Sequence, residues 1–400
     1  MRSRDLKHFA LSVCAAIVMT AGCGGSQPPI GAPGAMPQMP AVASNTRVAD
    51  KSVETLFSFD VKDGSEPTGL VAVKGVLYGL TETGGPYDAG TAFSLTTSGK
   101  ESVLYYFGSG ADGQNPVGAP ILVDGNYYGV TEHGGANSLG TVFSLSPSGK
   151  QQWLYSFGAE PGGSIPTGGL VVVDGTLYGT TAEGGKSGCL DGCGTVFKIT
   201  TSGKEDIIHK FTGTKDGRFP NAPLMSDGSE LYGTAEEGGE YDWGTLFKVS
   251  IRGAEITLHS FGPSSDGDGL FPGSSPALFQ NELYGTAGGG EYGQGAIYKA
   301  SLKGKERVLY SFVTGGPNYA LVPLKGNLYG TTVGGGAHGY GTIFELTPSG
   351  KVTVLYSFGA NVNRGGVGPN SPMIVLNGSL YGTTSGGGKN HGGTVFTFTP

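Results

Sequence analysis

The sequence has 400 residues, of which 76 are glycine and 23 are proline, and its formal net charge is −7. Charged residues make up only 14% of the chain and carry no basic excess, which argues against a nucleic acid as partner. Glycine and proline together reach roughly a quarter of the residues, a fraction that indicates low complexity unless the sequence has a period.

Residues 1–23 have the pattern of an export signal. A basic start is followed by Phe9 to Ala21, an apolar stretch too short to span a bilayer as a stable helix. Thr20-Ala21-Gly22-Cys23 resembles the bacterial lipoprotein box, which implies that Cys23 is acylated and holds the protein to a membrane. Ordinary cleavage and secretion is the alternative. Gly24 stands where inner-membrane lipoproteins typically carry Asp, which favours the outer membrane in a cell that has one.

Residues 24–50 are predicted to be a tether. This segment is rich in Pro, Gly and Ala and shows no strand or helix period, a composition typical of a disordered, partly extended linker. At roughly 3.3 Å per residue it reaches about 80 Å, enough to hold a domain clear of a membrane surface. Residues 51–400 form that domain.

Residues 51–400 contain an internal repeat. A Tyr-Gly pair, a Gly doublet and a Gly-Thr-Val-Phe type run recur seven times, at intervals of roughly 50 residues. The pairs begin at Tyr78, Tyr128, Tyr178, Tyr232, Tyr284, Tyr329 and Tyr381. A period of this length indicates that each repeat is one supersecondary unit.

Each repeat holds four runs of strand character, β-branched or aromatic and bounded by turn residues. In the third repeat the first three are Leu170 to Val173, Thr176 to Thr181 and Thr195 to Ile199; the fourth is of the type at Trp153 to Phe157. Asp174-Gly175 predicts a tight hairpin, because both turn positions need positive φ. The first run is apolar on both faces, so we expect it to be innermost and covered on each side. Seven such four-stranded antiparallel meanders predict an all-β fold, a seven-bladed β-propeller.

The two ends of the repeat region complement each other. Val53 to Phe59 matches the fourth run of other repeats, whereas the last repeat stops at Thr394 to Pro400, after its third run. We therefore expect the N-terminal strand to complete the last blade, which closes the ring and hides a sheet edge.

Two sets of loops are expected on one face: those between second and third strands, and those from a fourth strand to the next blade. The first set carries acids at a repeated position, Glu82, Glu132, Glu183 and Glu236. They could form an acidic crown around a channel mouth that binds a cation or sugar hydroxyls. Alternatively they fill solvated loops and cap turns, which their repetition favours, because a catalytic residue is needed only once. The second set carries Asp-Gly-x-x-Pro, whose Asp is expected to accept backbone N–H bonds.

Three histidines break the repeat: His133, His338 and His391. Counting repeats assigns them to blades one, six and seven, which a closed ring makes neighbours. One hypothesis is a divalent metal held by them at the channel mouth; exposed loop histidines are the other. No cofactor is predicted otherwise, since the sequence has no phosphate loop, Gly-x-Ser-x-Gly elbow or His-Glu-x-x-His motif.

Two cysteines, Cys189 and Cys193, remain once Cys14 leaves with the signal and Cys23 is acylated. In an oxidising compartment they are expected to form a disulfide. Zinc binding would need further ligands, and this short motif has no His partners.

The kernel Leu-Tyr-Gly-Thr-Thr, Gly-Gly, Gly-Thr-Val-Phe and Leu-Tyr-Ser-Phe resembles the bacterial choice-of-anchor tandem repeat GloVer-containing proteins. The resemblance covers about Val53 to Pro400, and it implies a surface-anchored repeat protein without assigning any activity. Kelch and quinoprotein propellers are more distant in pattern. Both repeat a Trp in each blade, whereas this chain has only Trp153 and Trp243.

Together these features predict an exported, lipid-anchored propeller that works as a monomeric binding module for envelope glycans or proteins. The alternative is an extracytoplasmic hydrolase or lyase with a metal at the channel mouth. The sequence favours the non-enzymatic function, because no catalytic motif occurs in it.

Overall fold

The computed structural model describes residues 52–108, 112–158, 162–185, 188–263 and 268–400. By its internal contacts the chain divides into Met1–Thr46 and Arg47–Pro400. The predicted signal, Cys23 and the tether lie outside the described residues. Within the ranges just given, every regular element is a β-strand, and no helix is long and apolar enough to cross a membrane.

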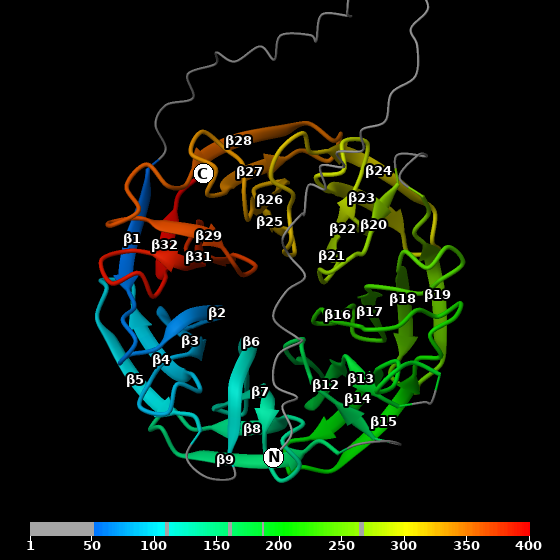
Figure 1. Ribbon diagram of the computed structural model, residues 1–400, viewed down its shortest axis with the longest axis horizontal. Helices are drawn as coiled ribbons and strands as arrows, with labels where there is room; N and C mark the ends of the chain where they lie inside the picture. Colours follow the sequence, from blue (N-terminus) through cyan, green and yellow to red (C-terminus); the bar gives the residue numbers. More distant parts are fainter. Residues whose placement is uncertain (1–51, 109–111, 159–161, 186–187, 264–267) are drawn as a thin grey trace, which may run out of the picture. The chain divides into compact units, whose positions relative to one another are not determined.

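Among the described residues the strands form seven antiparallel blades arranged around an axis (Figure 1), and two short strands form a separate two-stranded sheet. In blades 1 to 6 the strands are hydrogen-bonded in chain order from the innermost to the outermost, which is the predicted meander. Blade 1 contains β2 (Ser65–Val73), β3 (Val76–Thr83), β4 (Thr91–Thr96) and β5 (Glu101–Tyr106). Blade 2 contains β6 (Gly113–Val123), β7 (Asn126–Gly134), β8 (Thr141–Leu145) and β9 (Gln151–Ser156). Blade 3 contains β11 (Val171–Val173), β12 (Thr176–Thr181), β14 (Thr195–Thr200) and β15 (Glu205–Lys210).

The next three blades repeat this arrangement. Blade 4 contains β16 (Met225–Ser226), β17 (Glu230–Ala235), β18 (Thr245–Ser250) and β19 (Glu255–Ser260). Blade 5 contains β21 (Ala277–Phe279), β22 (Glu282–Gly289), β23 (Ala296–Ser301) and β24 (Glu306–Ser311). Blade 6 contains β25 (Val322–Leu324), β26 (Asn327–Thr332), β27 (Thr342–Leu346) and β28 (Val352–Ser357).

The last blade joins the two ends of the repeat region. It contains β30 (Ile374–Leu376), β31 (Ser379–Gly387) and β32 (Thr394–Phe398), with β1 (Val53–Ser58) as its outermost strand. β1 pairs antiparallel with β32, from Val53 opposite Phe398 to Ser58 opposite Thr394. The predicted seven-bladed propeller, completed by its N-terminal strand, is therefore confirmed.

Three blades carry additional short strands beside the second strand. β10 (Gly163–Ser164) pairs with β13 (Glu183–Gly184), β20 (Gly269–Leu270) with β22, and β29 (Gly366–Pro369) with β31. In each case the segment that leads into a blade is hydrogen-bonded to the end of that blade's second strand. This pairing extends the blade towards one face of the ring.

The hairpin and the innermost strand of blade 3 agree with the sequence predictions. Asp174 and Gly175 have φ angles of 48° and 74°, the positive values that the tight hairpin needs. On one side of β11, Val173 belongs to a buried cluster with Phe247 of blade 4. On the other side, Val172 packs on a cluster that contains Phe157, which follows β9 of blade 2.

Adjacent blades are held together by pairs of aromatic rings. The aromatic residue after each fourth strand meets the ring in the third strand of the next blade edge to face, with ring centroids 4.9 to 5.5 Å apart. The pairs are Phe59–Phe93, Phe107–Phe143, Phe157–Phe197, Phe211–Phe247, Phe261–Tyr298, Phe312–Phe344 and Phe358–Phe396. Such pairs add roughly 0.5–1.5 kcal/mol beyond the burial of their apolar area.

The glycine of each Tyr-Gly pair makes room for one of these rings. Gly179 lies opposite Phe197 in the sheet, and a Cβ atom at residue 179 would lie 2.6 Å from Cζ of that ring. A side chain cannot fit there without moving the aromatic ring. Blade 5 differs from the others because Tyr298 replaces Phe, and its hydroxyl is buried without a hydrogen-bond partner.

Ring closure leads to a test with two matched substitutions. Phe59 and Phe157 are both 0% exposed and occupy equivalent positions, but Phe59 follows the N-terminal strand. We expect Phe59→Ala and Phe157→Ala each to lower the free energy of unfolding by about 3–5 kcal/mol, measured by urea denaturation. A much smaller loss for Phe59→Ala would show that β1 is not firmly packed and that the ring is open.

Candidate functional site

The two loop sets predicted to share a face are hydrogen-bonded to each other. The second glycine of the doublet donates its N–H to the loop that leads into the same blade: Gly85 to the Val61 oxygen at 2.7 Å, and Gly239 to the Thr214 oxygen at 2.6 Å. Equivalent bonds begin at Gly135, Gly185, Gly290 and Gly388. We call the face formed by these loops the loop face.

The four predicted acids lie at the end of the second strand or directly after it. Glu82 is in β3, Glu132 in β7 and Glu183 in β13, and Glu236 follows β17. All four side chains are partly buried. The repeat therefore places these acids at equivalent positions on the loop face of blades 1 to 4.

Glu82 is the centre of an acidic group. Burial, with Glu66 and Glu132 as neighbouring acids, raises the pKa of Glu82 to about 7. Burial and the charge of Glu82 also raise the pKa of Tyr319, which precedes β25 of blade 6. Glu66 belongs to the same blade as Glu82 and Glu132 to the next one, so the charges that act on Glu82 come from two blades.

Glu236 has a different environment. Its carboxylate accepts a hydrogen bond from the Asn221 side chain, which lowers the pKa of Glu236, but burial raises it more strongly. A partly buried carboxylate held by an amide donor presents its oxygen atoms as hydrogen-bond acceptors in a fixed position. The predicted acids therefore differ from blade to blade in their partners, although the sequence repeats them.

The three predicted histidines are exposed. His133 lies in β7 of the second blade, so its assignment to the first blade is wrong, and the whole of blade 1 separates it from blade 7. His338 and His391 lie in the loops between second and third strands of blades 6 and 7. Within the described part of the chain, the side chains that lie close enough together to share a metal ion are His259, Asp268 and Glu306. The three predicted histidines are not among them.

Two of the Asp-Gly-x-x-Pro loops and the longer version have the predicted turn structure, whereas in the loop at Asp63 the carboxylate that accepts the backbone N–H bonds is that of Asp60. Gly108 N donates to Asp112 at 3.2 Å, and Thr212 N donates to Asp216 at 2.9 Å. In the longer loop, Gly262 N donates to Asp268 at 2.8 Å. These Asp residues therefore hold the segment that joins neighbouring blades.

The same Asp residues also contact the outermost strand of the preceding blade. Tyr105 of β5 donates its hydroxyl to Asp112 at 2.6 Å. In blades 3 and 4 a histidine replaces this tyrosine: His209 Nε2 lies 3.3 Å from Asp216, and His259 Nε2 lies 3.2 Å from Asp268. Two blade junctions therefore combine a histidine with a carboxylate.

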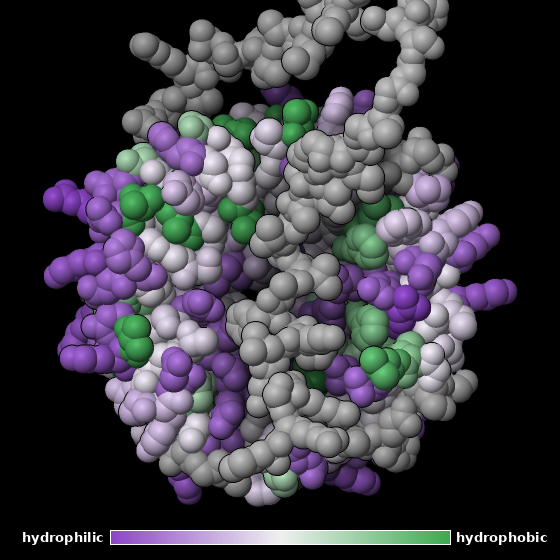
Figure 2. All heavy atoms as spheres, in the orientation of Figure 1, coloured by the Kyte–Doolittle hydropathy of each residue, from purple (hydrophilic) through white to green (hydrophobic). Residues whose placement is uncertain are grey.

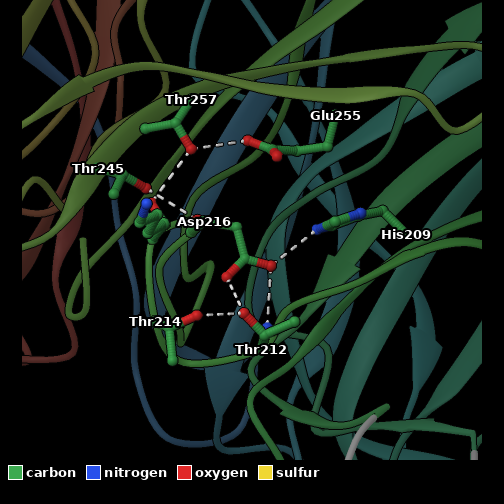
Figure 3. Close-up of polar contacts among 8 residues, drawn as sticks. His209, Thr212, Thr214, Asp216, Thr245, Glu255 and Thr257 are labelled. Carbon is green, nitrogen blue, oxygen red and sulfur yellow. Dashed lines mark hydrogen bonds and ion pairs between the residues drawn. The ribbon is translucent and has the colours of Figure 1, made fainter. Parts of the chain in front are cut away.

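A second acid comes from the start of the next outermost strand. At the junction of blades 3 and 4, Figure 3 shows Glu255 accepting a hydrogen bond from Thr257, near the His209–Asp216 pair. At the junction of blades 4 and 5, Glu306 Oε2 lies 3.8 Å from His259 Nε2. Burial raises the pKa of Glu306 to about 7.

A cavity of about 510 Å³ opens beside the second of these junctions. Its lining includes Glu240 and Tyr241 from a loop of the loop face, together with His259 and Asp268. The cavity thus connects the loop face with the His259 group.

Sequence reasoning missed this group because it considered the loops and not the outermost strands. His209 and His259 occupy the tyrosine position of the Leu-Tyr-Ser-Phe run, as a comparison of the repeats shows. The sequence signal was the replacement of tyrosine by histidine, together with an acid at the start of the fourth strand of the next blade. That acid is Glu255 for His209 and Glu306 for His259.

Exposed tyrosines are a further feature of the loop face. Tyr87, Tyr241, Tyr292 and Tyr340 follow the Gly doublets of blades 1, 4, 5 and 6 and are 47–54% exposed. On the face seen in Figure 2, the hydrophobic residues whose placement is described lie in small separate patches between hydrophilic ones. Exposed aromatic rings among polar groups suit a ligand with both polar and flat apolar surfaces.

The two cysteines shape one loop of blade 3. A disulfide joins Cys189 and Cys193, and Cys193 is fully buried in the cluster between blades 3 and 4. The bond is therefore part of the junction as well as of the loop.

The fold and the repeated loop face define a β-propeller built from tandem sequence repeats. The sequence matches the Gloeobacter/Verrucomicrobia repeat over residues 41–230, 163–324 and 314–400. The chain belongs to this repeat family, as the sequence resemblance predicted. No curated protein matches the sequence.

Solved structures with a similar fold are distant in sequence. The β-propeller domain of the Trilobed protease from Pyrococcus furiosus has a TM-score of 0.52 at 8% identity, covering 85% of this chain and 94% of that one. Puromycin hydrolase has a TM-score of 0.52 at 13% identity over 81% of this chain. The match spans 50% of the hydrolase. At these identities the likeness concerns the fold alone.

The burial of Glu82 among neighbouring acids makes stability depend on pH. The pKa of Glu82 is raised from 4.5 to about 7, so the folded chain keeps this proton to a higher pH than the unfolded chain. The stability that neutral Glu82 contributes is present below pH 4.5 and is lost as the pH rises through about 7. We expect the thermal midpoint to be lower at pH 8 than at pH 5, and Glu82→Gln to reduce that difference.

The control is Glu54→Gln, which removes an exposed carboxylate from β1 and should leave the pH dependence unchanged. The variant Glu82→Gln is expected to keep part of the dependence, because burial also raises the pKa of Glu101 to about 7. If the thermal midpoint of Glu82→Gln depended on pH in the same way as that of the wild type, the raised pKa of Glu82 would be contradicted.

Proposed function

We propose that this protein is an exported, lipid-anchored binding module of the cell envelope whose loop face binds an envelope glycan. It acts as a monomer. The observation that carries the proposal is that one face combines exposed tyrosines with partly buried acids at repeated positions. The acids can accept hydrogen bonds from sugar hydroxyls, and tyrosine rings offer flat, amphipathic surfaces against which sugar rings can pack.

An envelope protein is the other ligand class considered. Large stable protein interfaces commonly occupy continuous apolar patches, whereas the exposed tyrosines of the loop face are spread over blades 1, 4, 5 and 6 and carry polar hydroxyls. The glycan is therefore the preferred ligand. The propeller supplies a rigid frame for it, and binding residues are typically found on loops that such a scaffold positions.

Export and anchoring rest on the sequence of residues 1–50. The apolar stretch that ends in Thr20-Ala21-Gly22-Cys23 supplies the signal and the acylation site, and residues 24–50 supply the tether. A single acyl chain binds membranes only weakly, and stable attachment needs more than one. A multiply acylated N-terminal cysteine would hold the propeller at the membrane.

The anchor is tested by Cys23→Ser. In cells fed a labelled fatty acid, the wild type should carry the label and partition with membranes, and Cys23→Ser should lose both properties. Cys14→Ser, which changes the other cysteine of the N-terminal segment, should keep them. An unlabelled wild-type protein in the soluble fraction would contradict lipid anchoring and favour secretion.

Ligand binding is tested with loop-face tyrosines. The wild type is screened against envelope polysaccharides, and the Tyr87→Ala/Tyr292→Ala variant should bind its ligand at least about tenfold more weakly, because truncating one anchor typically costs more than 1 kcal/mol. Trp153→Ala is the matched control, since Trp153 is 48% exposed but lies on the outermost strand β9. Binding only to an envelope protein would replace the glycan, and binding to neither class would contradict the proposal.

A further inference from the structure

We propose that His259, Asp268 and Glu306 form a binding site for a divalent transition-metal ion at the junction of blades 4 and 5. Their ligand atoms all lie within 4.8 Å of one another. His259 Nε2 is 3.2 Å from Asp268 Oδ2 and 3.8 Å from Glu306 Oε2. Ligand atoms that each lie about 2 Å from one zinc ion are separated by roughly 3–4 Å, so small movements of these side chains suffice to bind a metal.

Glu306 supplies a second, independent observation. Its side chain is only 8% exposed, and its Oε1 atom is buried with no hydrogen-bond partner. A buried carboxylate oxygen without a donor or a cation is costly, and most such groups in proteins are paired. A metal ion between Glu306, His259 and Asp268 would provide the missing positive charge.

An unpartnered Oε1 also occurs in Glu101 and Glu205, which begin the fourth strands of blades 1 and 3, but Glu306 has both a histidine and an aspartate beside it. The neighbouring junction shows how such an acid can instead be satisfied. At the junction of blades 3 and 4 the equivalent acid, Glu255, accepts a hydrogen bond from the Thr257 hydroxyl at 3.1 Å (Figure 3). Thr257 lies opposite Phe247, and Val308 lies opposite Tyr298 in the same register. Because valine has no hydroxyl, Glu306 lacks the donor that Glu255 has.

Asp216, the aspartate of that neighbouring junction, is also well satisfied. It accepts hydrogen bonds from Thr212 N at 2.9 Å and from the Thr212 hydroxyl, as Figure 3 shows. These donors, with His209, lower the pKa of Asp216 although burial raises it. The two junctions share a histidine and two acids. Among the described residues that form them, the buried atoms without a hydrogen-bond partner are His209 Nε2 at the first and the carboxylate oxygen Glu306 Oε1 at the second, and His209 Nε2 lies 3.3 Å from Asp216.

The ligand set indicates the class of metal. One imidazole nitrogen with two carboxylate oxygens suits Zn²⁺, Mn²⁺ or Fe²⁺, whereas Ca²⁺ takes six to eight oxygen ligands. His259 and Asp268 line the cavity of about 510 Å³ beside Tyr241. The ion would therefore keep an open position for water or for a ligand group that enters from the loop face.

The site is independent of the proposed glycan binding. It lies between outermost strands and does not include the exposed histidines His133, His338 and His391. A failure of the metal site would leave the glycan experiment unaffected, because that experiment is carried out with Tyr87 and Tyr292, which are not ligands.

The test is a Zn²⁺ titration of the purified full chain after treatment with a chelator, by calorimetry and elemental analysis. We expect one Zn²⁺ per chain. Glu306→Gln and His259→Gln should each weaken binding by about tenfold or more. Glu255→Gln, at the equivalent position of the next junction, should leave the affinity unchanged.

Circular dichroism and the metal-free thermal midpoint establish that each variant is folded. If Glu306→Gln does not fold, His259→Gln decides, because His259 is partly exposed and its replacement keeps the size of the side chain. Absence of stoichiometric zinc in the wild type would overturn the proposal. Equal affinity in a folded Glu306→Gln or His259→Gln variant would also overturn it, as would an equal loss in Glu255→Gln.

Discussion

The contact on which this molecule depends is the edge-to-face packing of two aromatic rings at each blade junction. One ring follows the outermost strand of a blade, and the other comes from the third strand of the next blade. No sheet ladder runs from one four-stranded meander to the next. Single backbone hydrogen bonds, such as Asn115 N to the Ala89 oxygen and Phe219 N to the Cys193 oxygen, add to the aromatic contact between neighbouring blades. The Tyr-Gly glycine is part of the same device, since a Cβ atom at Gly179 would occupy the space of the Phe197 ring.

This packing separates the constant part of each junction from its variable part. The aromatic pair is kept at all seven junctions, with Tyr298 as the only departure from phenylalanine among the third-strand rings. Beside it, on the outer side, the residue that meets the Asp of the connecting loop is tyrosine at one junction and histidine at two others. The fold tolerates the exchange of tyrosine and histidine because these side chains are only partly buried. The polar groups can therefore differ between junctions without changing the aromatic pair that holds the blades together.

Closure by β1 makes the first and last repeats equivalent to the internal ones. Phe59 contacts Phe93 as closely as any other pair, and β1 forms a continuous ladder with β32. The propeller domain of the Trilobed protease from Pyrococcus furiosus is described as having an open velcro topology. In the present chain β1 pairs with β32, so β32 is not left as an edge strand and the last blade has a fourth strand like the others.

The sequence alone determined the number of blades, the order of strands and the closure, because each follows from a repeated pattern of glycine, β-branched and aromatic residues. It also indicated the acids of the loop face, since they occur at one position in successive repeats. Only the tertiary structure decided that Glu132 of blade 2 raises the pKa of Glu82 in blade 1 and that His259, Asp268 and Glu306 meet at a junction. His259 and Glu306 belong to different repeats, and their proximity depends on how one blade packs against the next. The sequence period predicts the strands and residue types of each blade. The contacts of a side chain across a junction depend instead on how the blades pack in the closed ring.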